Sequence, residues 1–204
     1  MSKASLHHLT LKAAFLVAIA SGHRVSTLNA LSVDPGHIRW EPQGVRLVPR
    51  PDFIAKNQTH SSPLVEVFLP SIASFSSVAD DKLWCPVRAL RWYLDRVKTK
   101  RCASSLFVTH IEPFKAASKS TIARWLVECI RAAGPEALVA DRIRAHDTRS
   151  ISTSWALFHG ASLKEIQAAA YWSSPNTFIA CYLKDVPRGE AAFASAVLKA
   201  ASGV

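Results

Sequence analysis

The stretch RAHDTRSISTSW, residues 144–155, carries the pattern from which the fold can be inferred. It places His146 three residues before Arg149, at the point where an apolar helical pattern begins. A His-x-x-Arg pair alone is weak, since a chain with 8 histidines and 25 lysines and arginines can contain one by chance. Its meaning therefore depends on the polar residues that the rest of the chain supplies.

The composition is that of a folded and strongly basic domain. The 204 residues, 49% of them hydrophobic, are enough to form one domain with a sizeable core. The formal net charge of +10 is typical of a domain that binds a polyanion, above all a nucleic acid. A basic soluble protein without such a partner is the alternative.

The cysteines and the apolar segments exclude two other classes of protein. The four cysteines form no C-x-x-C pair, and none has a histidine nearby at metal-ligand spacing, so we expect no metal site. Free thiols are typical of a reducing compartment, the cytosol or the nucleus. The apolar stretch AAFLVAIA, residues 13–20, is too short to span a bilayer, and we expect no membrane partner.

Hydrophobic periodicity predicts one mainly helical domain with a small sheet. Two short runs flank Pro42-Gln43-Gly44 and a third covers 65–70, which predicts three antiparallel strands. Ser162 and Glu165 fit a capping box, and Pro86 stands at the favoured first position of a helix. The expected helices cover 9–21, 24–32, a segment from Pro86 to Val97, 119–133, 147–159, a short segment after Ser162, a segment from Pro175 that carries Phe178 and Tyr182, and 189–200.

Four further segments carry residues whose chemistry matches that of the His-x-x-Arg pair. In chain order the set is Arg24, Lys56, His146, Arg149, Trp172 and Tyr182. Arginine offers parallel donors to a phosphate and stays protonated, so Arg24 and Arg149 suit the non-bridging oxygens of a phosphodiester. Tyr182 is the candidate nucleophile. Phenol has a pKa of about 10, so it needs a base and a positive environment to ionise.

The remaining candidates would move protons or hold the nucleophile. Lys56, on a polar loop, can protonate the leaving 5′-oxygen, and nearby arginines would lower its pKa. His146 would act as the base or orient the phosphate. Trp172 would pack against the tyrosine segment, and its indole N–H can reach a phosphate oxygen.

As a whole, the set resembles the catalytic domain of the tyrosine recombinases, the phage-integrase family. SGHRVSTLNAL (21–31) resembles the first arginine box of the family, and HDTR (146–149) resembles its His-x-x-Arg box. AAYWSSPNTFIACYL (169–183) resembles the box that supplies a His or Trp and then the tyrosine. CPVRALRWYL, RWLVECIR and RAHDTRSISTSWALFHG more narrowly resemble recombinases of DIRS-like and Ngaro-like retrotransposons.

The resemblance covers nearly the whole chain and implies a fold, an activity and partners. It implies a single catalytic domain over 1–204 with the fold of DNA breaking-rejoining enzymes: mainly α, with a three-stranded antiparallel sheet. The activity it implies is that of a site-specific DNA recombinase or integrase, which binds DNA through a basic surface and cleaves and rejoins its strands through a 3′-phosphotyrosyl intermediate without a metal or ATP. It also implies double-stranded DNA as partner, self-association in a synaptic tetramer, and no cofactor. We expect a nuclear protein if the chain comes from a eukaryotic retrotransposon, and otherwise a cytoplasmic one.

Two features depart from the family pattern. Tyr171 stands before Trp172 where the family usually has glycine, so this turn is expected to be strained or shifted. The separate N-terminal core-binding domain that clamps DNA is expected to be absent, because the chain begins where the catalytic domain would begin. These departures keep a second hypothesis open, a catalytically inactive DNA-binding relic of a retrotransposon recombinase. A type IB topoisomerase shares the chemistry, but this chain is short for one.

Each candidate also has a purely structural interpretation. Tyr182 and Trp172 taken singly are more often core residues, and Lys56 taken singly is a solvated loop residue. Arg24 and Arg149 stand near helix starts, where a cation opposes the helix dipole, and this hints at an anion between them. On the DNA-facing side we expect contacts from Lys115, Lys119 and Arg124, around the start of the 119–133 helix and opposite its apolar face. The basic run at 96–101 is equally consistent with a solvated surface.

Overall fold

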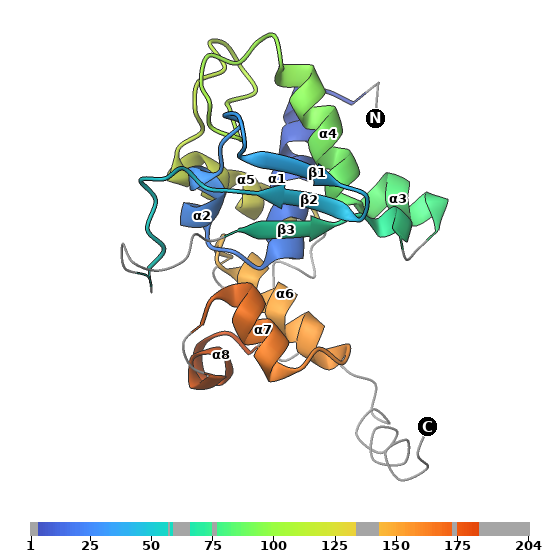
Figure 1. The fold of residues 1–204 in the computed structure, drawn as a ribbon, viewed down its shortest axis with the longest axis vertical. Coiled ribbons are helices and arrows are strands. Elements are labelled where there is room, and N and C mark those ends of the chain that lie inside the picture. The colour runs from blue at the N-terminus through green and yellow to red at the C-terminus, as the bar shows by residue number, and fades with distance from the viewer. Residues whose placement is uncertain are drawn as a thin grey trace.

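The computed structural model describes residues 4–56, 58, 66–74, 77–133, 143–172 and 175–183. Helix α1 lies at the centre, a small sheet covers one side of it, and α6, α7 and α8 form a second group below (Figure 1). The predicted class, mainly helical with a three-stranded antiparallel sheet, is confirmed. The helices are α1 (Leu6–Ser21), α2 (Val25–Ala30), α3 (Val78–Trp84), α4 (Pro86–Val97), α5 (Lys119–Ala132), α6 (Asp147–Phe158), α7 (Leu163–Ala170) and α8 (Pro175–Cys181).

Helix α1 positions the first candidate arginine. It begins at Leu6, three residues before the predicted start, because the hydroxyl of Ser5 accepts a hydrogen bond from the His8 N–H. It ends at Gly22, which has a left-handed conformation (φ 61°) and donates its N–H to the Ala18 carbonyl. Only glycine takes this conformation without a steric cost, so the predicted Ser21-Gly22 end has a physical reason.

The sheet has the order β1-β2-β3 and is antiparallel throughout. Its strands are β1 (Ile38–Glu41), β2 (Gly44–Leu47) and β3 (Val67–Pro70). Alternate side chains of β2 and β3 point inward and join the main core, among them Val45, Leu47, Val67 and Leu69. Arg46 on the other face lies over the ring of Phe68, 4.9 Å from its centroid.

One helix and one helical turn were not predicted. Residues 72–74 form a 3-10 turn, and α3 follows, with Ser77 as its N-cap. No residue of α3 is buried, and its apolar side chains Val78, Leu83 and Trp84 are exposed. Periodicity could not reveal this helix because it has no face that packs into a core.

The described residues form two hydrophobic cores. The main core joins α1, α4, α5 and the sheet, and the smaller one lies within α7, α8 and the segment that connects them. The smaller core consists of Ile166, Ala170, Trp172, Phe178 and Tyr182. The predicted capping box of Ser162 and Glu165 opens α7, and the helices near 86–97, 119–133 and 147–159 lie within a residue of their predicted bounds. The predicted helix over 189–200 lies outside the described residues.

Candidate active site

Arg24 and Arg149 come together although 125 positions separate them. Arg24 is the half-buried N-cap residue of α2, directly after the Gly22 turn, and its side chain makes no capping hydrogen bond. Arg149 is in the first turn of α6 and is 1% exposed. Both arginines line one small cavity beside the end of α7.

Arg149 connects the two groups of helices. Its Nη1 donates to the carbonyl of Gly22 at 2.7 Å, and its Nη2 donates to the carbonyl of Ala170 at 2.7 Å. Its Nε is buried and has no hydrogen-bond partner among the described residues. The phenol of Tyr182 lies close enough to the guanidinium to raise its pKa, so the Nε–H is a donor that an oxygen at this site could share with Tyr182.

The aromatic candidates surround the same guanidinium. The Arg149 Cζ lies 4.5 Å from the ring centroid of Trp172 and 5.4 Å from that of Tyr182. The rings of Trp172 and Tyr182 are 4.6 Å apart, and the ring of His146 is 4.9 Å from that of Tyr182. The indole N–H of Trp172 is buried and has no partner among the described residues. Two unpartnered buried donors thus lie close to one phenol.

Hydrogen bonds from two helices fix Tyr182. Its N–H donates to the Phe178 carbonyl at 2.9 Å, just past the end of α8, and its own carbonyl accepts from the Ser154 hydroxyl of α6 at 3.1 Å. Its ring is 8% exposed and belongs to the smaller core. The structural and the catalytic interpretations of this residue are therefore compatible.

The electrostatics of the site favour an anion and a neutral histidine. Burial, and then the charge of Arg24, lower the pKa of Arg149 to about 10, while the phenol of Tyr182 raises it. Arg149 thus stays protonated at neutral pH. Burial, and then the charges of Arg149 and Arg24, lower the pKa of His146. Its imidazole is therefore neutral at pH 7, which is the form that can accept a proton.

The cavity of the two arginines contains two residues that the sequence did not point to as site residues. His23 and Tyr171 line it, and their rings lie 5.4 Å apart. Burial, and then the charges of Arg149 and Arg24, lower the pKa of His23 to about 4. Position next to Arg24 was the one available signal for His23. Tyr171 has the left-handed conformation (φ 51°), so the expected strain at this turn is present.

Lys56 lies apart from this group. Its neighbours Ala55 and Gln58 line the arginine cavity, but Lys56 itself lines a separate hollow of about 480 Å³. That hollow also contains Arg50 and Lys119. In the described state, the structure therefore does not bring Lys56 together with Arg24 and Arg149.

The three residues expected to contact DNA are all exposed. Lys119 lines the hollow of Lys56. Arg124 lies near His110: burial and then the charge of His7 lower the pKa of His110, and the charge of Arg124 also contributes to this lowering. Lys115 precedes α5. Arg124 is on the exposed side of α5, opposite the buried Ile122 and Trp125, as predicted. Their role in DNA binding stays a prediction.

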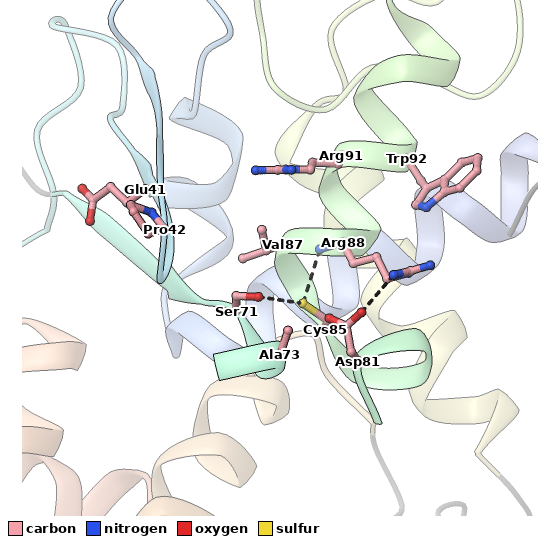
Figure 2. Close-up of a pocket in the computed structure, with 10 residues that line it drawn as sticks. All are labelled: Glu41, Pro42, Ser71, Ala73, Asp81, Cys85, Val87, Arg88, Arg91 and Trp92. Carbon is pink, nitrogen blue, oxygen red and sulfur yellow. Dashed lines mark hydrogen bonds and ion pairs between the residues drawn. The ribbon is translucent and has the colours of Figure 1, made fainter. Parts of the chain in front are cut away.

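A further cavity, of about 390 Å³, lies between the β1–β2 turn, α3 and α4 (Figure 2). Arg88 pairs there with Asp81 at 2.9 Å, and the Cys85 thiol accepts a hydrogen bond from the Arg88 N–H at 3.4 Å. None of the candidate residues from the sequence lines it. Of the candidate residues, Arg24 and Arg149 line the smaller arginine cavity, whereas His146, Trp172 and Tyr182 contact one another or Arg149 outside its lining.

No group of three or more His, Cys, Asp or Glu residues in the described ranges could hold a metal ion. None of the helices found there has the length and hydropathy needed to cross a membrane.

Comparison with solved structures identifies the fold. The chain matches XerA recombinase with a TM-score of 0.57 at 18% identity, over 97% of this chain and 61% of that one. It matches the XerH site-specific recombinase, bound to a palindromic difH substrate in a post-cleavage complex, with a TM-score of 0.63 at 14% identity, over 100% and 48%. A lambda integrase dimer bound to a COC′ core site matches with a TM-score of 0.51 at 17% identity, over 91% and 57%.

These matches show the tyrosine recombinase fold. The chain spans about half to three fifths of the length of these structures. No family model and no curated protein matches the sequence. The resemblance inferred from the sequence motifs is thus confirmed at the level of fold, and the narrower retrotransposon relationship stays a prediction.

The buried position of Arg149 predicts a large effect on stability. Arg149→Ala would leave the Gly22 and Ala170 carbonyls without their donors, which costs about 1–3 kcal/mol for each buried group. Relief of the buried charge offsets part of this cost, so we expect a loss of about 2–4 kcal/mol in unfolding free energy. Arg24→Ala is the matched control and should lose less than about 1 kcal/mol. Urea unfolding measures both, and equal losses would contradict the connecting role of Arg149.

Proposed function

We propose that this chain is the catalytic domain of a tyrosine-type DNA recombinase that cleaves and rejoins strands through a 3′-phosphotyrosyl intermediate. One observation carries the proposal: Arg24, His146, Trp172 and Tyr182 come together near the guanidinium of Arg149. These residues belong to segments that are far apart in the sequence. The recombinase fold supports it.

The proposed reaction is a phosphoryl transfer in which a side chain of the site takes up or supplies each proton and stabilises the charge on the phosphate. The phenolic oxygen of Tyr182 attacks the phosphorus while its proton passes to the neutral His146. The bond from phosphorus to the 5′-oxygen breaks, and Lys56 protonates that oxygen. Arg24 and the free Nε–H of Arg149 stabilise the charge on the non-bridging oxygens, as preorganised donors do in other enzymes. Rejoining reverses these steps: a 5′-hydroxyl attacks the phosphotyrosine and releases Tyr182.

The cavity in the described state is closed, which bears on the alternative function. Its volume of about 20 Å³ holds about one water molecule, less than a phosphate group needs. A DNA-binding relic without activity would keep this closed state on DNA, whereas an enzyme must open it. The buried donors of Arg149 and Trp172, which have no hydrogen-bond partner among the described residues, support an anionic ligand at this site, as either function requires.

The partners follow from the same proposal. We propose that residues 1–204 form one catalytic domain, that it acts on double-stranded DNA, and that it assembles into a synaptic tetramer. Its origin in a DIRS-like or Ngaro-like element, and with it a nuclear location, rests on the motifs at 85–94, 124–131 and 144–160.

Covalent capture tests the function. The protein is incubated with supercoiled plasmid, denatured, and separated from free DNA. An enzyme leaves protein covalently attached to a 3′ end and resistant to denaturant. DNA binding without any such adduct supports the relic.

The hollow of Lys56 and Lys119 predicts how DNA binding depends on salt. Each phosphate that a cation contacts adds about 0.9 to the slope of log K against log salt concentration for duplex DNA. Lys119→Gln should therefore make the slope less steep by about 0.9. Lys98→Gln is the matched control. Lys98 lies at the C-terminal end of α4 and lines neither the arginine cavity nor the hollow of Lys56, so this variant should leave the slope unchanged. Fluorescence anisotropy from 50 to 300 mM salt gives both slopes, and a change in Lys119→Gln no larger than that in the control would exclude a phosphate at this hollow.

A further inference from the structure

Tyr171 has a conformation that its own backbone does not favour. It ends α7 with φ 51° and ψ 49°, where its N–H donates to the Ala168 carbonyl and the Trp172 N–H donates to the Gln167 carbonyl. This is the hydrogen-bond pattern that glycine normally completes. A tyrosine there is strained, and its side chain must have compensating contacts.

Those contacts attach the ring to two fixed points. The ring lies against His23, 5.4 Å away and tilted by 32°, and its hydroxyl donates to the Glu66 carbonyl at 3.2 Å. Glu66 is held in turn, because its carboxylate pairs with Arg39 and Arg46 of the sheet. Tyr171 therefore bridges the end of α7, the residue before Arg24 and the residue before β3.

The position of this bridge matters because Tyr171 is part of the wall of the arginine cavity. Four of the residues that line the cavity are almost completely buried, with 7% exposure or less: His23, Thr27, Arg149 and Ala170. Tyr171 is 38% exposed, and its side chain belongs to neither hydrophobic core. It can leave the cavity by giving up one aromatic contact and one hydrogen bond, whereas the buried four cannot move without disrupting a core or a helix.

We propose that Tyr171 is a positioning residue that gates the arginine cavity: in the free protein it covers His23, Arg24 and Arg149, and it swings away when a phosphodiester binds. This rests on the proposed function, since it takes the arginine cavity, which Tyr182 does not itself line, as the place where a phosphate reaches Arg24 and Arg149. Departure of the ring uncovers His23, a neutral imidazole between two arginines, and enlarges the cavity on its solvent side. The gate belongs to this chain in particular, because a glycine at the same turn would have no side chain to close it.

Inorganic phosphate binding tests the gate without any need for catalysis. We would titrate phosphate at pH 6 and constant ionic strength and follow the His23 Cε1–H signal by NMR, assigned with His23→Gln. Tyr171→Gly and Tyr171→Asn both tolerate the left-handed conformation and remove the ring. Tyr171→Phe keeps the ring and removes only the hydrogen bond to Glu66.

The expected changes follow from the contacts that are lost. One aromatic contact and one hydrogen bond together correspond to about a tenfold change in an equilibrium constant, so Tyr171→Gly and Tyr171→Asn should bind phosphate about tenfold more tightly. Tyr171→Phe should gain about threefold. Adding Arg24→Gln to Tyr171→Gly should abolish the signal change.

A matched control separates gating from relief of strain. Phe114 is the other non-glycine residue with positive φ (53°) in the described ranges, and it does not line the cavity. Phe114→Gly should leave phosphate affinity unchanged. Equal phosphate affinity in the parent and in all three Tyr171 variants overturns the gate, and so does an equal gain in Phe114→Gly.

The covalent-capture assay distinguishes failure of the gate from failure of the proposed function. If the gate exists and the chain is an enzyme, Tyr171→Gly forms adducts about tenfold faster than the parent at subsaturating DNA. If phosphate affinity rises as expected but no variant forms an adduct, the gate stands and the recombinase activity fails. If adducts form at equal rates and phosphate affinity is unchanged, the activity stands and the gate fails.

Discussion

Tyr182→Phe should bind duplex DNA as tightly as the parent protein and form no covalent adduct with it. The substitution removes only the phenolic oxygen, which is the proposed nucleophile. The ring that packs 4.6 Å from Trp172 and 4.9 Å from His146 stays in place, so the smaller core should persist. The measurement is covalent capture on supercoiled plasmid, together with anisotropy on a labelled duplex and thermal unfolding of both proteins.

The matched control for this experiment is the other phenol near the arginines. Tyr171→Phe should keep forming adducts, because in our proposal its hydroxyl holds the gate and does not attack phosphorus. Adducts that persist in Tyr182→Phe and vanish in Tyr171→Phe would reverse the assignment. Tyr171 would then be the nucleophile, which its place in the lining of the arginine cavity permits.

Lys56→Ala should slow cleavage of ordinary DNA by about 10²–10⁴-fold, the usual contribution of a general acid. Replacing the bridging 5′-oxygen by sulfur should restore nearly the full rate. A thiol has a pKa of about 8.5, so a thiolate leaves without being protonated. Single-turnover cleavage of oxygen-bridged and sulfur-bridged duplexes measures this rescue directly.

Two controls make the result specific to acid catalysis. Arg24→Ala should not recover with sulfur, since its defect lies at the non-bridging oxygens. It is a better control than Arg149→Ala, whose buried guanidinium also connects the helix groups. Lys119→Ala shares the hollow of Lys56 and should not recover either. If sulfur fails to rescue Lys56→Ala, or rescues all three variants alike, Lys56 contacts a phosphate and is not the acid.

The sulfur-rescue experiment is needed because Lys56 lies apart from the other candidate residues. In the described state Lys56 lies with Lys119 and Arg50 and not with the two site arginines. Its neighbours Ala55 and Gln58 line the arginine cavity, and our proposal requires that Lys56 also reaches it when DNA binds.

Sequence alone determined the elements whose signals are local. The apolar period of α4, α5 and α6, the proline at the start of α4, the glycine at the end of α1 and the capping box of α7 depend on residues a few positions apart. The pattern of three strands likewise follows from short alternating runs with a turn between the first two. The order of the motifs added the recombinase fold, because a set of boxes in one order is far more specific than any single box.

Only the tertiary structure decided how the candidate groups relate in space. Arg149 is a hydrogen-bonded connection between α1 and α7 as well as a site residue, and no local pattern indicates that its partners are the carbonyls of Gly22 and Ala170. The same is true of His23, which owes its low pKa to burial and to two arginines that reach it from different helices. Periodicity records which face of a helix is apolar, but long-range contacts determine which charges meet and which cavities are open. The separation of Lys56 from the arginines and the place of Tyr171 in the wall of the arginine cavity therefore became visible only in the folded chain.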